Sequence, residues 1–266
     1  SENIIGEKIP ISGIAGDQQA ALFGQLCTNK GDVKNTYGTG CFCIMNTGEK
    51  PVFSKNKMLT TIAWKINGKT SYAIEGSVFI AGALVQWLRD KLKIIKSASE
   101  IENLAKTVED NGGVTFIPAL SGLGAPYWSQ RAQGAIFGIT RDTESGHIAL
   151  AGLESIALRT MDIIIEMQKD ANSNFSNLKV DGGASNNNLL MQIQSNLLKK
   201  NVIRPKITET TALGAAFLAG LSVNYWQSID SLKSMWKMDC EFKPDSNSQK
   251  NIIELWKKRI KKIIDE

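Results

Sequence analysis

The chain has 266 residues, of which 42% are hydrophobic, and this is enough to bury the core of one large domain. No apolar run approaches the roughly 20 residues that a membrane span needs, and the absence of a targeting segment predicts a cytoplasmic protein with no membrane partner. A single histidine, His147, and four cysteines without CxxC spacing give no zinc site or disulfide framework. The net charge of +5 comes largely from the lysine-rich residues 251–266, which lack the interleaved aromatics of nucleic-acid-binding proteins, so no nucleic-acid partner is expected.

Hydrophobic patterning predicts strands near the start of the chain, within residues 34–46 and 58–74, with Asn67-Gly68 as a turn. A further strand is expected at 178–180, directly before a glycine pair. Helical spacing and one capping pair predict the helices, which are expected at 76–90, from Ser97 (paired with Glu100), and at 144–169, 186–200, 211–220 and 251–266. No internal repeat interrupts this order.

The first segment that could carry chemistry is ISGIAGDQQAALFGQ, in which a short apolar strand is expected to meet Gly16 and Asp17 before a helix of small residues. A carboxylate at a strand end can take the proton of an attacking hydroxyl or hold magnesium through water, and a neighbouring glycine lets substrate approach closely. The same pair is also typical of a turn or a helix cap. The segment by itself leaves both interpretations open.

Three later segments are rich in glycine. The turn at residues 35–40 could bring backbone amides and the Thr39 hydroxyl to a phosphate, although any tight turn would look similar. The strand and glycine pair at 180–187 could place a nucleotide against bare backbone at a helix start, or form only a tight connection. The loop at 121–128 suits either the rigid wall of a cleft or a packed surface loop.

These motifs in their order, GDQQAALFGQ, NTYGTGCF, GLGAPYW, GAIFGIT and DGGASNNNLLMQ, resemble the carboxy-terminal half of the glycerol kinases, within the FGGY family of carbohydrate kinases, over roughly residues 9–225. The resemblance implies an α/β fold of the actin-like, ribonuclease H-like ATPase type, with a mixed sheet flanked by helices. It also implies ATP and Mg²⁺ as cofactors, transfer of the γ-phosphate of ATP to glycerol, and ADP and sn-glycerol 3-phosphate as products.

The resemblance divides the candidate site into two sets of residues. In the acceptor set, Asp17 matches the general base and lies near the magnesium through water, while Gln18 and Phe42 match positions that contact the polyol. In the nucleotide set, Thr39 and Gly40 match the turn that touches the phosphates. The full nucleotide set is Thr39, Gly40, Gly82, Gln86, Gly183 and Asn187.

Family members also have an amino-terminal domain with a phosphate loop and polyol-binding side chains, for which this sequence shows no match. We therefore expect residues 1–27 to be the last strand and crossover helix of that missing domain, and residues 28–266 to be the carboxy-terminal nucleotide-binding domain. Ile11, Ile14 and Leu22 would then lack their natural sheet neighbours. The chain alone is expected to be incomplete as an enzyme, and the full-length protein is expected to be a homo-oligomer.

Two alternatives remain at this stage. The chain could belong to another FGGY kinase, acting on xylulose, ribulose or gluconate, although GTGCF and GAPYW favour glycerol. It could also be a stand-alone nucleotide-binding module without catalysis.

Overall fold

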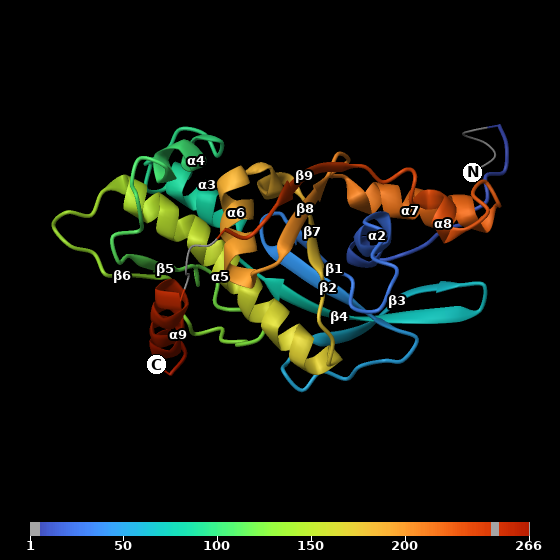
Figure 1. Ribbon diagram of the computed structural model, residues 1–266, viewed down its shortest axis with the longest axis horizontal. Helices are drawn as coiled ribbons and strands as arrows, with labels where there is room; N and C mark the ends of the chain where they lie inside the picture. Colours follow the sequence, from blue (N-terminus) through green and yellow to red (C-terminus); the bar gives the residue numbers. More distant parts are fainter. Residues whose placement is uncertain (1–5, 246–249, 266) are drawn as a thin grey trace.

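The computed structural model describes residues 6–245 and 250–265 and is built around a mixed, seven-stranded sheet in the order β3-β4-β2-β1-β7-β8-β9 (Figure 1). β1 is parallel to β7, and β7 is parallel to β8, whereas the pairs β1–β2, β2–β4, β3–β4 and β8–β9 are antiparallel. The strands are β1 Val33–Tyr37, β2 Cys41–Gly48, β3 Leu59–Ile66, β4 Lys69–Val78, β7 Asn177–Asp181, β8 Asn201–Pro205 and β9 Met238–Phe242. A separate two-stranded sheet pairs β5 Thr115–Ile117 with β6 Ala135–Phe137.

Helices cover both faces of the large sheet, as expected for the α/β fold. The long helix α5 packs on one face over a core that includes Tyr37 and Cys43. Helices α2 and α7 pack against each other on the other face, where Leu22 and Phe217 meet Ile44. The helices are α2 Asp17–Gly24, α3 Gly82–Asp90, α4 Glu100–Ala105, α5 Ser145–Ala171, α6 Asn188–Leu198, α7 Thr210–Ser222, α8 Ile229–Leu232 and α9 Lys250–Ile264. Within the described residues, none of these helices is both long and apolar enough to cross a membrane.

The expected elements are present, with shifted boundaries. Both residues of the Asn67-Gly68 turn have positive φ, which suits a tight hairpin. The helix expected at 76–90 begins only at Gly82, because residues 76–78 complete the ladder of β4 with β2. The helix expected from Ser97 begins at Glu100. Helical spacing and the Ser97–Glu100 pair predicted that both segments contain a helix, but strand pairing decided where the first helix could start.

The strand expected before Asp17 is not formed, because residues 6–16 have no strand partner within the described part of the chain. Ile11 and Ile14 are accordingly 84% and 85% exposed. The expectation for Leu22 was wrong, because its side chain is fully buried where α2 packs against α7 and β2.

Helix α9 confirms the amphipathic pattern of the lysine-rich end. Its Trp256 is fully buried and donates from Nε1 to Asp162 Oδ2 on α5 at 3.0 Å. Asp162 Oδ2 also accepts from the Tyr127 hydroxyl and from Arg159. The lysines of α9 lie on the exposed side of the helix, so the apolar stripe docks and the charged face is solvated.

Candidate functional site

The nucleotide set gathers at one edge of the sheet, where the parallel strands β1 and β7 end together. Thr36 is in register with Asp181, so the turn after β1 and the glycine pair after β7 lie side by side. The carboxyl ends of parallel strands are where open α/β sheets bind ligands. A cavity of about 440 Å³ opens there, between the turn and helices α3, α4, α5 and α6.

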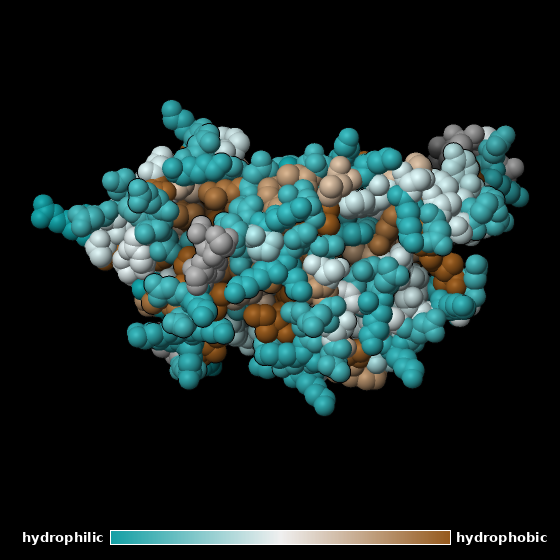
Figure 2. All heavy atoms as spheres, in the orientation of Figure 1, coloured by the Kyte–Doolittle hydropathy of each residue, from teal (hydrophilic) through white to brown (hydrophobic). Residues whose placement is uncertain are grey.

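The cavity walls are mainly apolar, with polar groups at the rim. Val85, Ile101, Leu153, Ile156 and Leu190 supply the apolar surface, and hydrophobic atoms are visible where α3, α4 and α6 gather (Figure 2). A nearly apolar cleft with a few convergent polar groups is the usual form of a small-molecule site.

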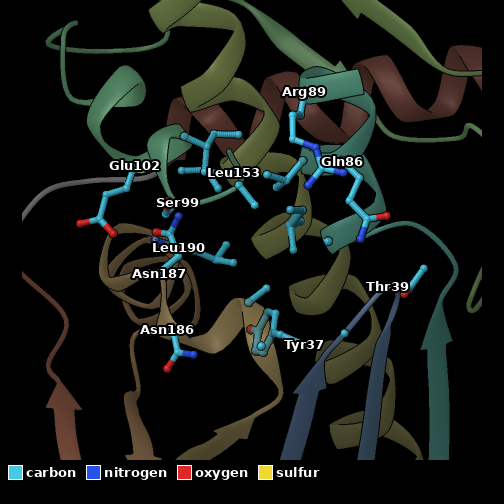
Figure 3. A pocket seen from close by; sticks show the side chains of 18 residues that line it. Tyr37, Thr39, Gln86, Arg89, Ser99, Glu102, Leu153, Asn186, Asn187 and Leu190 are labelled. Atoms are coloured by element: carbon cyan, nitrogen blue, oxygen red, sulfur yellow. Dashed lines mark hydrogen bonds between the residues drawn. The ribbon is translucent and has the colours of Figure 1, made fainter. Parts of the chain in front are cut away.

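Figure 3 shows the polar rim from close by. Gln86 and Arg89 project from α3 on one side, while Glu102 and Asn187 lie on the opposite side. Thr39 lies at the end of β1. Five of the six residues of the nucleotide set line this cavity: Thr39, Gly82, Gln86, Gly183 and Asn187.

Gly40 is the member of the nucleotide set that does not line the cavity. It is buried, and a Cβ there would lie 2.2 Å from the carbonyl oxygen of Val78, so close backbone packing requires glycine. The carbonyl of Thr39 accepts from the amides of Ala81 and Ala83, at 2.9 and 3.0 Å, which fixes the turn against the start of α3. Among the described residues, the amides of Thr39 and Gly40 have no acceptor, and that of Thr39, which is exposed and lines the cavity, remains available to an anion.

The other wall of the cavity begins with Gly183, and a Cβ added there would meet no atom within 4 Å. The absence of a side chain therefore leaves open space rather than relieving a contact inside the protein. Asn187 caps α6, because its Oδ1 accepts from the amide of Leu190 at 2.8 Å. Its Nδ2 group is the part left to face a ligand, and it can only donate.

The acceptor set lies on the α2 side of the sheet. Asp17 is the first residue of α2; its carboxylate is exposed and its Oδ1 accepts from the amide of Gln18 at 2.8 Å. Phe42 on β2 is half-buried and pairs with Thr36 on β1, so the two side chains share one face. Lys34 and Ile44, the next pair on that face, lie under α2. The structure thus brings Asp17, Gln18 and Phe42 to one side of the turn after β1.

Charged groups that the sequence interpretation missed surround the acceptor set. Lys34 is fully buried, and its Nζ donates to Gln18 Oε1 and Thr36 Oγ1, both at 2.6 Å. Burial lowers the pKa of Lys34, and the carboxylate of Asp181 opposes this shift. The pKa of Glu75 on β4 is raised, mainly by burial; the charge of Lys34 opposes this shift and the charge of Asp17 adds to it. Strand alternation would have placed Lys34 and Thr36 on one face, but it gave no sign of which helix covers them.

The model of the FGGY family of carbohydrate kinases, C-terminal domain, matches residues 33–223, which contain the cavity and β1 to α7. The chain belongs to the FGGY family. The glycerol kinase of Dichelobacter nodosus is 56% identical over 263 residues, covering 98% of this chain and 53% of that protein. The glycerol kinase of Burkholderia pseudomallei is 58% identical over 246 residues, covering 92% of this chain and 49% of that protein. The FGGY chain therefore spans about half the length of the curated relatives it matches.

Solved structures agree with this assignment. A Plasmodium falciparum glycerol kinase with ADP superposes with a TM-score of 0.90 at 41% identity, over 96% of this chain and 51% of that one. A xylulose kinase from Lactobacillus acidophilus superposes with a TM-score of 0.81 at 20% identity, over 91% of this chain and 49% of that one. The second likeness shows the actin-like sugar-kinase fold alone.

Several residues of the cavity of this FGGY domain were not predicted from the sequence. Arg89 lies three residues after Gln86 on α3, and this helical spacing was the available signal. Glu102 also lines the cavity, where its Oε2 accepts from the amide of Asn188 at 3.0 Å and joins α4 to the start of α6. No sequence pattern indicated that α4 would come to lie against α6.

Proposed function

We propose that this domain is the nucleotide-binding half of an ATP-dependent glycerol kinase, which transfers the γ-phosphate of ATP to glycerol and releases sn-glycerol 3-phosphate and ADP. The observation that carries the proposal is the identity of 56% to 58% with glycerol kinases, together with 41% identity to a glycerol kinase with ADP. The xylulose and gluconate kinases that share the fold are only 20% identical.

The nucleotide is proposed to occupy the cavity at the ends of β1 and β7. The free amide of Thr39, with the Thr39 hydroxyl, would bind phosphate oxygens, since backbone amides in a tight turn favour anions. The adenosine would lie against the bare backbone of Gly183, where open space supports its presence. Asn187 Nδ2 would donate to the nucleoside, and Gly82 and Gln86 would border it from α3.

The acceptor hydroxyl is proposed to approach from the α2 side. Asp17 would accept the proton of the attacking hydroxyl, and its exposed carboxylate, with one oxygen free of protein donors among the described residues, supports this role. Gln18 would hydrogen-bond the polyol, and half-buried Phe42 would form an apolar wall. These residues orient the reactants, which is the main task of a protein in phosphoryl transfer.

The residues present suit Mg²⁺ that arrives with the nucleotide. Among the described residues no group of three or more His, Cys, Asp or Glu side chains could hold a metal. Magnesium commonly keeps several waters and binds through one or two carboxylates plus substrate phosphates, so Asp17, acting through water, would be the protein's contact with the ion. When bound, the ion would neutralise phosphate charge.

The complete enzyme is proposed to contain a second, amino-terminal lobe and to work in the cytoplasm as a homo-oligomer. Residues 1–27 would belong with that lobe, and residues 28–266 would form the nucleotide lobe. Helix α2 packs against α7, and we propose it as the joint between the two lobes. Exposed Ile11 and Ile14 support a covering partner for this segment.

The test is a chimaera in which this chain follows the part of the Dichelobacter nodosus glycerol kinase that it does not cover. We expect ADP release that depends on glycerol and magnesium ATP, at roughly 1 to 100 per second as in other kinases. The 266-residue chain alone should show no such turnover, because one lobe cannot close on itself. A chimaera that phosphorylates xylulose, ribulose or gluconate in place of glycerol would contradict the proposal.

A further inference from the structure

A buried chain of hydrogen bonds connects α2 with the ends of β1 and β7. Lys34 Nζ donates to Gln18 Oε1 on α2 and to Thr36 Oγ1 on its own strand, both at 2.6 Å. The Thr36 hydroxyl donates in turn to Asp181 Oδ1. Asp181 Oδ2 accepts from Gln25 Nε2 at 2.8 Å and from Thr210 Oγ1 at 2.6 Å. The network thus joins α2, β1, β7 and α7 beneath the proposed acceptor site.

Lys34 decides which way the side-chain amide of Gln18 points. An ammonium group has three donors and no acceptor, so the atom of Gln18 that faces it must be the carbonyl oxygen. The amide nitrogen then points elsewhere, and no acceptor for Gln18 Nε2 is found among residues 6–245 and 250–265. Gln18 is half-buried, so this nitrogen can reach a ligand. The side chain is presented as a hydrogen-bond donor.

Asp181 anchors Lys34 in this position. Lys34 is 0% exposed and Asp181 is 1% exposed, so the two opposite charges lie in the same dry layer and are bridged by Thr36. A buried charge is retained only where a partner charge and hydrogen bonds satisfy it. Asp181 also directly precedes the glycine pair at the edge of the cavity. The same network therefore fixes both the Gln18 amide and the end of β7.

We propose that Lys34 is a positioning residue: it locks the Gln18 amide with its NH₂ group toward the acceptor, so that Gln18 donates to a polyol hydroxyl oxygen. This inference rests on the proposed function, because it takes a polyol as the ligand of Gln18. Lys34 itself touches only protein groups and acts through Gln18.

The first test examines the contact itself and needs no catalysis. In the ¹⁵N-labelled 266-residue chain, the Lys34 ammonium should give a slowly exchanging NMR signal, as expected for a buried and hydrogen-bonded group. Gln18→Ala should shift this signal. Gln19→Ala is the matched control, because Gln19 is the next residue of α2 and donates to Thr61 rather than accepting from Lys34. An unchanged Lys34 signal in Gln18→Ala would overturn the proposal.

The second test measures kinetics in the chimaera. Gln18→Ala should raise KM for glycerol roughly tenfold, the scale of one hydrogen bond, with KM for ATP unchanged. Lys34→Met should raise KM for glycerol by up to this factor, because it frees the Gln18 amide to turn away. The double variant should have the KM for glycerol of Gln18→Ala, since Lys34 acts only through the Gln18 donor that this variant has already lost. Additive effects, or a rise confined to KM for ATP, would contradict a role through Gln18.

Gln18→Glu covers the case in which Lys34→Met does not fold. A glutamate keeps an oxygen for Lys34 but removes the outward NH₂ group, so KM for glycerol should rise as in Gln18→Ala while the Lys34 signal persists. A normal KM in Gln18→Glu would show that Gln18 does not act as a donor. If the unmodified chimaera lacks glycerol kinase activity, the proposed function fails, whereas the NMR result still decides whether Lys34 holds Gln18.

Discussion

The glycine pair after β7 allows a sharp test of where the nucleotide lies. A Cβ at Gly183 meets no protein atom within 4 Å, and the residue has no positive φ, so Gly183→Ala should not strain the fold. The smaller entropy of the unfolded chain should even stabilise it by about 0.4 to 1 kcal/mol. The neighbouring Gly182 is the opposite case, with φ of 82° and a Cβ position 2.6 Å from the carbonyl oxygen of Tyr37. Gly182→Ala should therefore lose at least about 1 kcal/mol of stability.

Gly183→Ala should weaken ADP binding although it leaves the fold stable. If adenosine packs on the backbone of Gly183, the added methyl group takes its place, and overpacking of this kind costs about 1 to 3 kcal/mol. The affinity for ADP should then fall roughly 5- to 150-fold. Binding is followed by NMR titration of this chain with ADP, and stability is followed by thermal unfolding without ligand. Unchanged ADP affinity in a folded Gly183→Ala protein would refute adenosine binding against Gly183.

Two further predictions concern carboxyl groups. Burial raises the pKa of Glu154 from 4.5 to about 7. The folded state therefore keeps a proton that the unfolded state loses, and stability falls as the pH rises between these values. In Glu154→Gln the amide oxygen can still accept from Asn111. At pH 8 this variant should raise the free energy of unfolding by up to about 3 kcal/mol, and thus the melting temperature by several degrees, with little effect at pH 4.5. An equal gain at both pH values would contradict this. In the chimaera, Asp17→Asn should lower kcat about 100-fold or more with KM for ATP unchanged, and near-normal turnover would remove Asp17 as the base.

The sequence by itself determined the family and most of the elements. The motifs occur in a fixed order, and each depends on local chemistry: glycines at tight turns, an asparagine at a helix start, and a hairpin at Asn67-Gly68. Helices and strands follow from periodicity because side chains on one face must be buried together. Five of the six residues that the family resemblance implied for the nucleotide set line one cavity.

Only the tertiary structure decided which distant residues share the site. Nothing within the chain around Lys34 shows that α2 covers it, or that Asp181 in a strand far along the sequence neutralises it. The start of α3 was fixed by the pairing of β4 with β2, which overrode the helical pattern before Gly82. Burial of Leu22 and exposure of Ile11 likewise depend on which elements pack against them. Strand pairing and burial depend on residues that are distant in the sequence. A sequence pattern therefore predicts which side chains must be buried or paired, but only the folded structure shows against which residues.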